Sequence, residues 1–577
     1  MKRFGKILIV LGLLLQFVGC TGQKQPEPEI SFEEYTQEFV QYYYSETDFG
    51  INFDFEHPEE YGITRGIYEF SGFTKEDYTL YMDALKEEIS FLKSFNYKNL
   101  TEEEQWTYDL ILDYLEREYA LKDFFYQDMK MFGSFTGMNS NVPLLMDEFT
   151  FNDKQDVDSY INLLKTLKVA YESYLEIELE RQEKGFGLPQ YAIDGIIEQC
   201  DTILATEDYF LENSFNEKID AVDFLSAEEK EEYKLLNKEH LYGDYYEAFQ
   251  LLKDGLAVID ATKYNEMGLI HQKDGLDYYR ALIKNQIGID THPKDLVKYL
   301  NNKIYEVIEE YMDMYTVYGD SLFDTYTYLD GVDNVNDAID YLYEEIQEDF
   351  PYVEKSDVDV KEVDDSMKEN FSPAAYLVTK YDTPVTSREV ILVNGEYSDS
   401  SFTTYAHEGY PGHLYQTVYY KSLGLNMVNY LLSNTGYSEG WAVYTEQHSL
   451  KYSDLPTEVQ EFEVVNNKLY YSVMALAELK VHYEGFTKAE FFTFITDYYG
   501  VDRETSDEIY ETILELPCYY LYYFMSYLLI DDFKTEMMES YGDSFTDYQF
   551  HEFMLNHGNG SLGLIEERLH KLLKEKK

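Results

Sequence analysis

Apolar and polar residues alternate along most of the chain with the period of an α-helix. Thr101 and Glu104 are spaced as a capping box, and apolar residues follow them every three or four positions. A second segment of the same kind runs from Tyr160 and stops near Gly185. Proline is scarce, at 12 residues, which favours long helices. The same spacing predicts helices over residues 192–206, 227–254, 294–316, 335–347, 406–422, 437–450, 457–485, 488–498, 505–535 and 562–575.

Alternation with the period of a β-strand is rare. The clearest case is residues 390–394, a short run rich in β-branched side chains that predicts a strand beside the helix at 406–422. Acidic residues and Pro351 interrupt the helices over 349–365, which is either a domain boundary or a surface loop, and we favour the loop. The predicted fold class is mainly α: a large, two-lobed helical body around a deep cleft, with one short β element.

The chain begins with the features of an exported protein. A short basic start is followed by an apolar run from Ile7 to Val18, which is too short to span a bilayer. Gly19-Cys20 closes the run in the way that lipoprotein processing recognises, so Cys20 is predicted to become the lipidated first residue. The simpler alternative is an ordinary thiol near an export signal.

These features divide the chain into three parts. Residues 1–19 are the predicted lipoprotein signal peptide, residues 20–31 hold the lipidated cysteine and a flexible tether, and residues 32–577 form one helical domain. The predicted location is extracytoplasmic, with the protein anchored to the bacterial cell membrane through the lipid on Cys20 alone.

Composition and charge narrow the classes of partner. Cys200 and Cys518 lie far apart in apolar contexts and are predicted to be buried thiols rather than a disulfide framework. A chain of 577 residues that is 45% hydrophobic and 17% aromatic can bury a large core. The net charge of -65 argues against a nucleic-acid partner and against adsorption to anionic lipid. We interpret the charge as a solvated surface, with an acidic recognition surface as the alternative.

The richest group of metal-binding residue types is His407-Glu408-Gly409-Tyr410-Pro411-Gly412-His413. Two neutral imidazoles and the carboxylate of Glu439 are the ligand types of a catalytic zinc that keeps one position open for water. Glu408 stands beside the first ligand, where it could accept that water's proton. Simpler interpretations stay open: a polar pair on a helix surface for His407 and Glu408, a structural histidine for His413 and a helix cap for Glu439.

The spacing of the two histidines does not suit one regular helix. His413 follows His407 by six residues, which at about 100° per residue places it roughly 120° round the helix. A regular helix therefore cannot direct both rings at one metal. Pro411 and Gly412 allow the helix to bulge or restart, and two inserted residues could then return His413 to register.

The motif, together with Glu439-Gly440-Trp441-Ala442-Val443-Tyr444-Thr445-Glu446, resembles the DUF885 family of bacterial proteins, many of them assigned as lipoproteins. That family is grouped with the zincin-like metallopeptidases of the MA clan. The resemblance implies an α-helical zincin-like fold, in which His407, His413 and Glu439 are metal ligands and Glu408 is the base. It also makes Tyr523 the candidate donor to an oxyanion, against a default role in packing.

Two positions depart from the family's pattern. Leu414 stands where members often carry a second histidine after Pro-Gly-His, which narrows the ligand choice to His413. Cys518-Tyr519 stands where members tend to have Gly-Gln.

Three further residues are candidate supporting or reserve groups. Glu446 lies seven residues after Glu439 on the same helix face and is predicted to support a metal ligand by a hydrogen bond. His482 lies on an apolar helix, where a histidine is more often a satisfied core residue, and it is the reserve ligand if His413 points away. His551 is a candidate donor to a bound substrate.

The function favoured by the sequence is zinc-dependent hydrolysis of short peptides by a cell-envelope lipoprotein, with metal-bound water as the nucleophile. The predicted partner is a short peptide, with no nucleic acid and with membrane contact only through the lipid anchor. Zinc is the expected cofactor, and the same ligands also accept other divalent ions. The alternative is a non-catalytic lipoprotein that binds peptides or another ligand on the same scaffold.

Overall fold

The structure is a computed structural model that describes residues 28–261, 266–364, 368, 371–378, 380–398 and 401–576. The predicted signal peptide, Cys20 and most of the predicted tether lie outside these residues. In the described part of the chain, none of the helices combines the length and the apolar character needed to cross a membrane.

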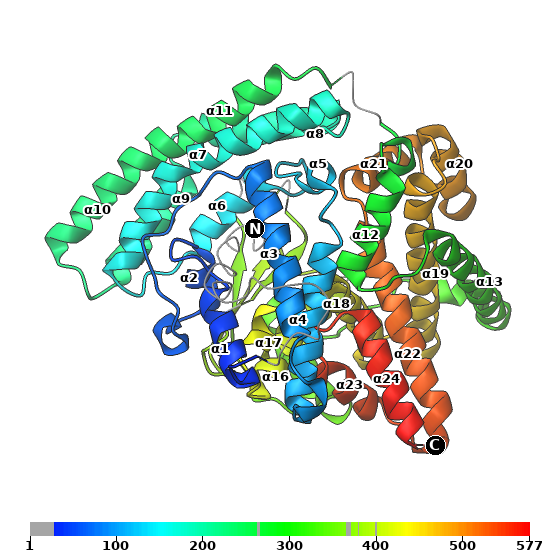
Figure 1. The fold of residues 1–577 in the computed structure, drawn as a ribbon. Helices are drawn as coiled ribbons and strands as arrows, with labels where there is room; N and C mark the ends of the chain where they lie inside the picture. Colours follow the sequence, from blue (N-terminus) through cyan, green and yellow to red (C-terminus); the bar gives the residue numbers. More distant parts are fainter. Residues whose placement is uncertain are drawn as a thin grey trace, which may run out of the picture.

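Helices make up most of the molecule, which confirms the predicted fold class (Figure 1). In the first half they are α1 (Phe32–Tyr42), α2 (Gly50–Asp54), α3 (Lys75–Leu92), α4 (Glu102–Tyr119), α5 (Phe125–Asp128), α6 (Met138–Glu148), α7 (Lys154–Lys184), α8 (Gln190–Ala205), α9 (Phe210–Ala221), α10 (Ala227–His240), α11 (Tyr246–Ala257) and α12 (Gly275–Ile287). The capping box at Thr101 is present, because its hydroxyl accepts from the Glu104 N–H at 3.2 Å and the Glu104 carboxylate accepts from the Thr101 N–H at 2.8 Å.

The second half supplies the helices that carry the motif residues. They are α13 (Pro293–Tyr318), α14 (Val335–Glu345), α15 (Phe402–Glu408), α16 (His413–Ser422), α17 (Val428–Leu431), α18 (Thr435–Ser449), α19 (Thr457–His482), α20 (Lys488–Tyr499), α21 (Arg503–Glu515), α22 (Ser526–Tyr541), α23 (Asp547–Asn556) and α24 (Leu562–Lys576). A π-helical turn, η13 (Leu521–Met525), precedes α22.

One small sheet has the strand order β1-β3-β2. The central strand β3 (Arg388–Val393) pairs in parallel with β1 (Asp357–Glu362) and antiparallel with β2 (Ala374–Leu377). This confirms the β element predicted near residues 390–394. In the acidic segment 349–365, residues 357–362 form strand β1 and pair with β3, so the surface loop favoured there is wrong for these residues.

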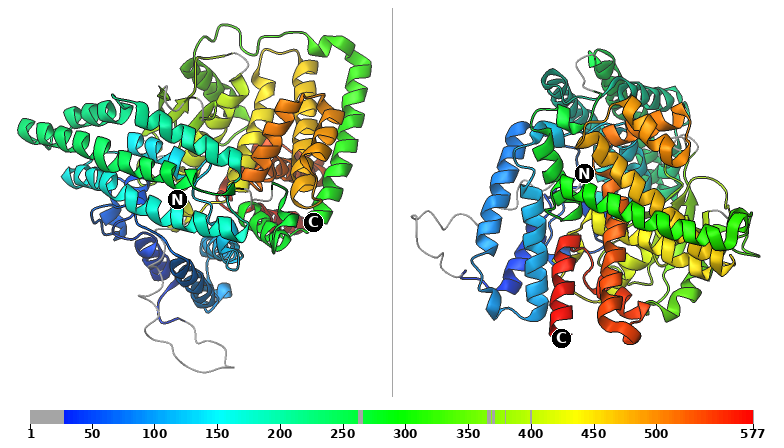
Figure 2. Two further views of the ribbon diagram at one scale, coloured as in Figure 1. Left: turned by 90° about the horizontal axis from the view of Figure 1, so that it is seen from above. Right: turned by 90° about the vertical axis from the view of Figure 1, so that its right-hand side faces the viewer.

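Two groups of helices lie on opposite sides of the molecule (Figures 1 and 2). Helix α11 packs on α7 and α8, and with α10 these helices extend to one side of the molecule. On the other side α13 packs on α19, and α22 packs on α18. A cavity of about 430 Å³ lies between the groups, lined by residues of α7 and of α12. Helix α18 also contacts α15, which brings distant parts of the sequence together at the motif.

The single helix predicted over 505–535 is wrong, since the structure places two helices there. Helix α21 ends at Glu515, and Pro517 follows two residues later. Proline offers no N–H and disfavours a helical residue before it, so the chain leaves the helix at this point. Cys518 then takes a positive φ of 76° before the π-helical turn begins. This break turns the tyrosines of η13 toward the candidate site.

Both described cysteines, Cys200 and Cys518, are buried and free, as predicted. Burial raises the pKa of the Cys200 thiol to about 12, and burial followed by the charge of Glu478 raises that of Cys518. Both groups therefore remain protonated thiols in the core.

Glu88 on α3 is a buried carboxyl whose ionisation opposes folding. Burial raises its pKa, the Tyr35 hydroxyl lowers it and the charge of Glu38 raises it further, to a net value of about 7 against an ordinary value of 4.5. Between these pH values the folded protein holds a proton that the unfolded chain has released. The free energy of unfolding therefore falls as the pH rises through that window.

We expect Glu88→Gln to remove this fall, which amounts to at most about 3 kcal/mol. Thermal midpoints at pH 5 and pH 8 should differ less in Glu88→Gln than in the native protein. The exposed neighbour Glu87 supplies the matched control, because Glu87→Gln should leave the native pH dependence in place. An unchanged difference in Glu88→Gln would contradict the assignment.

Candidate metal centre

The motif lies on two short helices rather than one. Helix α15 ends at Glu408 and α16 begins at His413, so the continuous helix predicted over 406–422 is wrong. The Gly409 N–H still donates to Tyr405 O at 2.9 Å, and the chain then turns through a cis Tyr410–Pro411 peptide bond. The spacing argument anticipated such a restart, because a regular helix would separate the two rings.

Gly412 makes the turn this tight. A Cβ atom added at Gly412 would lie 1.8 Å from the carbonyl oxygen of His407 and 2.4 Å from that of Ala406. These distances are far below any van der Waals contact, so only glycine fits here. The close approach places the start of α16 directly against the end of α15.

The turn brings His407 and His413 face to edge and points both at Glu439 on α18. Their ring centroids are 4.7 Å apart at an interplanar angle of 85°. Glu439 Oε2 lies 3.6 Å from His407 Nε2 and 3.4 Å from His413 Nε2. One donor atom from each of the three residues lies within 4.8 Å of the other two.

This spacing suits a tetrahedral metal ion. Bonds of about 2.0–2.2 Å to nitrogen and oxygen place neighbouring tetrahedral ligands roughly 3.3–3.6 Å apart. Glu439 Oε2 is buried, and in the described structure it makes no hydrogen bond. A buried carboxylate oxygen without a hydrogen bond, next to two imidazole nitrogens, is a position that a cation would satisfy.

The charges of the three residues are strongly coupled. Burial raises the pKa of the Glu439 carboxyl, but the His413 and His407 rings lower it more, and the net pKa lies well below the ordinary value. Burial lowers the pKa of His407, whereas Glu439 and Glu446 raise it, and the net pKa lies well above the ordinary value. Glu439 is therefore ionised, as a ligand must be.

A second layer of contacts fixes the two rings. Glu446 Oε1 lies 2.6 Å from His407 Nδ1, and the Tyr471 hydroxyl donates to Glu446 Oε2 at 3.2 Å. With Nδ1 directed at Glu446, Nε2 is the ring nitrogen that faces Glu439. His413 Nδ1 lies 3.3 Å from the Ser438 hydroxyl, on the same helix as Glu439. Glu446 therefore contacts a candidate ligand, and its role in supporting a metal ligand stays a prediction.

Trp441 ties the turn to α18. Its indole N–H donates to Pro411 O at 3.1 Å, and its side chain is fully buried. The turn between the histidines and the helix that carries Glu439 are therefore held together by a specific hydrogen bond as well as by packing.

Glu408 lies beside the three ligand atoms, and a hydrogen bond from the sheet holds its carboxylate in place. Its Oε2 accepts from the Tyr376 N–H of β2 at 2.7 Å, and its Oε1 lies 4.0 Å from His407 Nε2. The carboxyl is thus oriented by one oxygen while the other faces the candidate centre. This is the geometry of a group that can exchange a proton with a bound reactant.

Tyr523 approaches from the other side, on η13. Its ring lies 6.4 Å from that of His407 at 29°. Burial and then the charge of Glu439 raise the pKa of its hydroxyl well above the usual range, so the group is a proton donor in hydrogen bonds. The structure therefore brings together His407, Glu408, His413, Glu439, Glu446 and Tyr523.

A family model described as "Bacterial protein of unknown function (DUF885)" matches residues 60–569. The chain belongs to the DUF885 family. A comparison with curated proteins finds no match for this DUF885 protein.

Two solved structures share its fold. The "putative lipoprotein" from Colwellia psychrerythraea superimposes with a TM-score of 0.77 at 15% identity, covering 95% of this chain and 100% of its own. The "putative lipoprotein of unknown function" from Shewanella oneidensis gives 0.58 at 16% identity, covering 86% and 92%. A "putative oligoendopeptidase F" from Bacillus anthracis gives a TM-score of 0.29 at 12% identity, covering 86% and 96%, and this TM-score is too low to support a shared fold.

Two residues predicted to belong to the functional site of this DUF885 protein lie outside the group around Glu439. His482 is buried in the core, where Nδ1 accepts from the Leu269 N–H at 3.2 Å and Nε2 lies 2.9 Å from Ile513 O. His551 is also buried, with Nδ1 2.7 Å from Asp349 O and Nε2 2.8 Å from the Tyr444 hydroxyl. Each ring has both nitrogens occupied, so neither His482 as a reserve ligand nor His551 as a substrate donor fits this arrangement.

A second group of ligand types, which sequence spacing did not indicate, consists of Asp349, His448 and Asp547. Lys451 lies 2.5 Å from the Asp349 carboxylate and 3.3 Å from that of Asp547, and Lys534 lies 2.9 Å from Asp547. Two ammonium groups thus neutralise the two carboxylates, and the cluster is an ion-pair network. Its members are distant in sequence, so no sequence motif predicts this cluster.

Proposed function

We propose that this protein is a zinc-dependent peptidase that hydrolyses short peptides, with the metal held by His407, His413 and Glu439. The observation that carries the proposal is the convergence of three ligand atoms across a broken helix on a buried Glu439 oxygen that has no hydrogen bond. Packing alone does not require such an arrangement, because a buried carboxylate oxygen without a hydrogen bond costs stability.

Zinc bound there would lower the pKa of a water molecule and polarise a peptide carbonyl. Glu408 accepts a proton from the attacking water on the oxygen that faces the centre and returns it to the leaving amine. Tyr523 donates its hydroxyl hydrogen bond to the oxygen that gains negative charge in the transition state. Glu446 keeps the His407 ring in the orientation and tautomer that a ligand needs.

The arrangement of elements agrees with an extended peptide as substrate. Strand β2 lies at an edge of the sheet and directly beside Glu408. Main-chain groups of an edge strand that the sheet leaves unpaired can form hydrogen bonds with an extended peptide. A zincin-like fold of the MA clan is part of this proposal, as is attachment to the outer side of a membrane through Cys20. The two similar structures are both named "putative lipoprotein", which supports that location.

Metal analysis of the purified protein tests the proposal. We expect one zinc per chain, loss of cleavage of short peptides on chelation, and recovery when zinc is returned. His407→Ala should lower the zinc content, while Lys168→Gln, a change at an exposed lysine of α7, should not. Protein that binds no stoichiometric zinc, and gains no activity from added zinc, would leave the non-catalytic peptide-binding lipoprotein as the better description.

A further inference from the structure

The cavity of about 430 Å³ between the two helix groups takes most of its lining from four parts of the chain. They are residues 127–130 at the end of α5, residues 186–189 between α7 and α8, one face of α12, and residues 514–517 at the end of α21. The lining mixes leucine and proline side chains with glutamine and with charged residues of both signs. A cavity of this size, partly apolar and with a few polar groups, is typical of a ligand site.

The cavity reaches the candidate metal centre through two residues. Thr435 lines it and begins α18, four residues or about 6 Å before Glu439. Thr435 and Glu439 together line a second cavity of about 280 Å³. Tyr522 also lines the larger cavity, and it lies on η13, which packs against α18. The larger cavity therefore begins beside the proposed catalytic centre.

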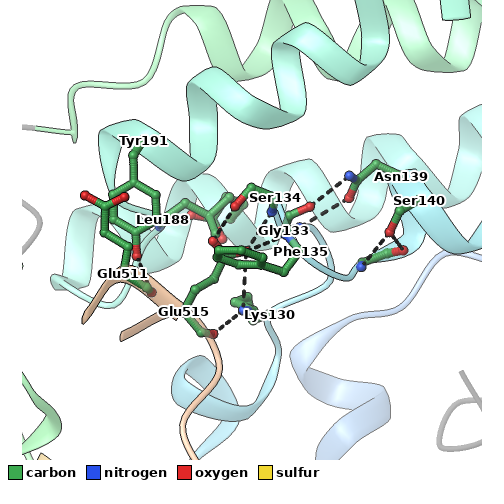
Figure 3. A network of polar contacts seen from close by, with 12 residues as sticks. Lys130, Gly133, Ser134, Phe135, Asn139, Ser140, Leu188, Tyr191, Glu511 and Glu515 are labelled. Atoms are coloured by element: carbon green, nitrogen blue, oxygen red, sulfur yellow. Dashed lines mark hydrogen bonds and ion pairs between the residues drawn. The ribbon is translucent and has the colours of Figure 1, made fainter. Parts of the chain in front are cut away.

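Lys130 places an ammonium group in the lining of this cavity. Its Nζ donates to the main-chain oxygen of Glu515, and the Glu515 carboxylate lies 3.9 Å away (Figure 3). That carboxylate accepts two other hydrogen bonds, from the N–H and from the hydroxyl of Ser134, each at 2.6 Å. An ammonium has three donors, so Lys130 keeps two for the cavity. Burial lowers the pKa of Lys130 to about 8, which still leaves it charged at neutral pH.

The other charged groups of the cavity wall differ from Lys130. Arg181 donates to Glu178 at 2.7 Å and to the main-chain oxygens of Tyr126 and Phe186. Its charge is therefore paired with a carboxylate, and its guanidinium already donates three hydrogen bonds. Asp128 also lines the cavity, and its carboxylate has the opposite charge to Lys130, so it would favour a cationic ligand. The two residues thus predict opposite ligands, which makes them separable by experiment.

We propose that this cavity binds a carboxylate of the peptide substrate, with Lys130 as its counter-ion. The inference rests on the proposed peptidase function and assigns the cavity as the subsite that holds the charged group. Lys130 is the charged side chain there whose donors are incompletely used and whose nearest carboxylate is held by other groups. A carboxylate brought to it would gain a charge-assisted hydrogen bond in a partly buried place. The source is either the C-terminal carboxylate of the peptide or an acidic side chain.

Binding of matched peptides to zinc-loaded Glu408→Gln protein tests the inference without consuming the peptide. The first pair is acetyl-trialanine as free acid and as amide, which differ in the terminal carboxylate. The second pair has amidated ends and carries Glu or Gln as its last residue. We expect one acid to bind about 10- to 100-fold tighter than its neutral partner, as measured by calorimetry. Lys130→Gln should remove that preference, and Lys130→Arg should keep it.

Control variants separate the explanations. Lys168→Gln, at an exposed lysine of α7, should leave the preference intact. Which pair shows the preference identifies the source of the carboxylate. A preference that survives Lys130→Gln, or no preference in either pair, would overturn the inference. Tighter binding of a free amino terminus that depends on Asp128 and is lost in Asp128→Asn would overturn it as well.

The two proposals fail in different ways. A protein that cleaves peptides but shows no preference that depends on Lys130 keeps its proposed function and loses this subsite. A protein that shows the preference and cleaves nothing keeps the subsite as a binding site and loses the peptidase function.

Discussion

Glu408→Gln is expected to lower the turnover of short peptides by about 10²- to 10⁴-fold, the usual contribution of a positioned general base. An amide has the size of the carboxyl and its oxygen can still accept from the Tyr376 N–H, so the local structure should persist. It cannot take a proton from water, and the reaction loses its base. Steady-state kinetics with a chromogenic short peptide measure the loss in kcat.

Zinc content distinguishes the loss of a base from the loss of the site. Glu408 lies 4.0 Å from His407 Nε2 and is not one of the three converging ligands, so metal per chain should stay at the native value. Glu87→Gln, a change at an exposed position, serves as the control for the substitution itself. Retained turnover in Glu408→Gln, with zinc present, would remove Glu408 from its proposed role.

Local signals in the sequence predicted the elements whose stability is local. The capping box at Thr101 and the apolar spacing that follows it give α4, and the β-branched run near 390–394 gives β3. The exit from α21 was missed by the single helix predicted over 505–535, although Pro517 is a local signal that a helix ends. The π-helical turn that follows has no local signal, because it depends on the packing of η13 against α18 and α19.

The candidate site was predictable in its residue types but not in its supports. The six-residue spacing showed that His407 and His413 need a broken helix, and the break is there. The place of Glu439 came from family resemblance, because no local rule brings α18 against α15. The bond from Tyr376 to Glu408 joins residues 32 positions apart, and it requires β2 to pair with β3 first. Such contacts follow from the tertiary fold alone.

Gly412→Ala is expected to disable the centre, although Gly412 carries no chemistry itself. Its Cβ would lie 1.8 Å from His407 O, so the chain between α15 and α16 must open and move His413 away from His407 and Glu439. A displacement of about 1 Å costs on the order of 10²-fold in rate, and ligand bonds tolerate only about 0.2 Å. We expect zinc well below one per chain and peptide turnover reduced by at least about 10²-fold.

Gly243→Ala is the matched control, because a Cβ there meets nothing within 4 Å. Both variants add one methyl group in place of a glycine hydrogen, and they differ only in the space that the methyl group finds. Circular dichroism and the thermal midpoint should show Gly412→Ala to be folded, since the change lies in a short connection between helices. A folded Gly412→Ala protein that keeps one zinc and full turnover would show that the close approach of α15 and α16 does not bring the ligands together. Loss of zinc in that protein alone would make the tight turn, rather than the histidines by themselves, the feature that creates the site.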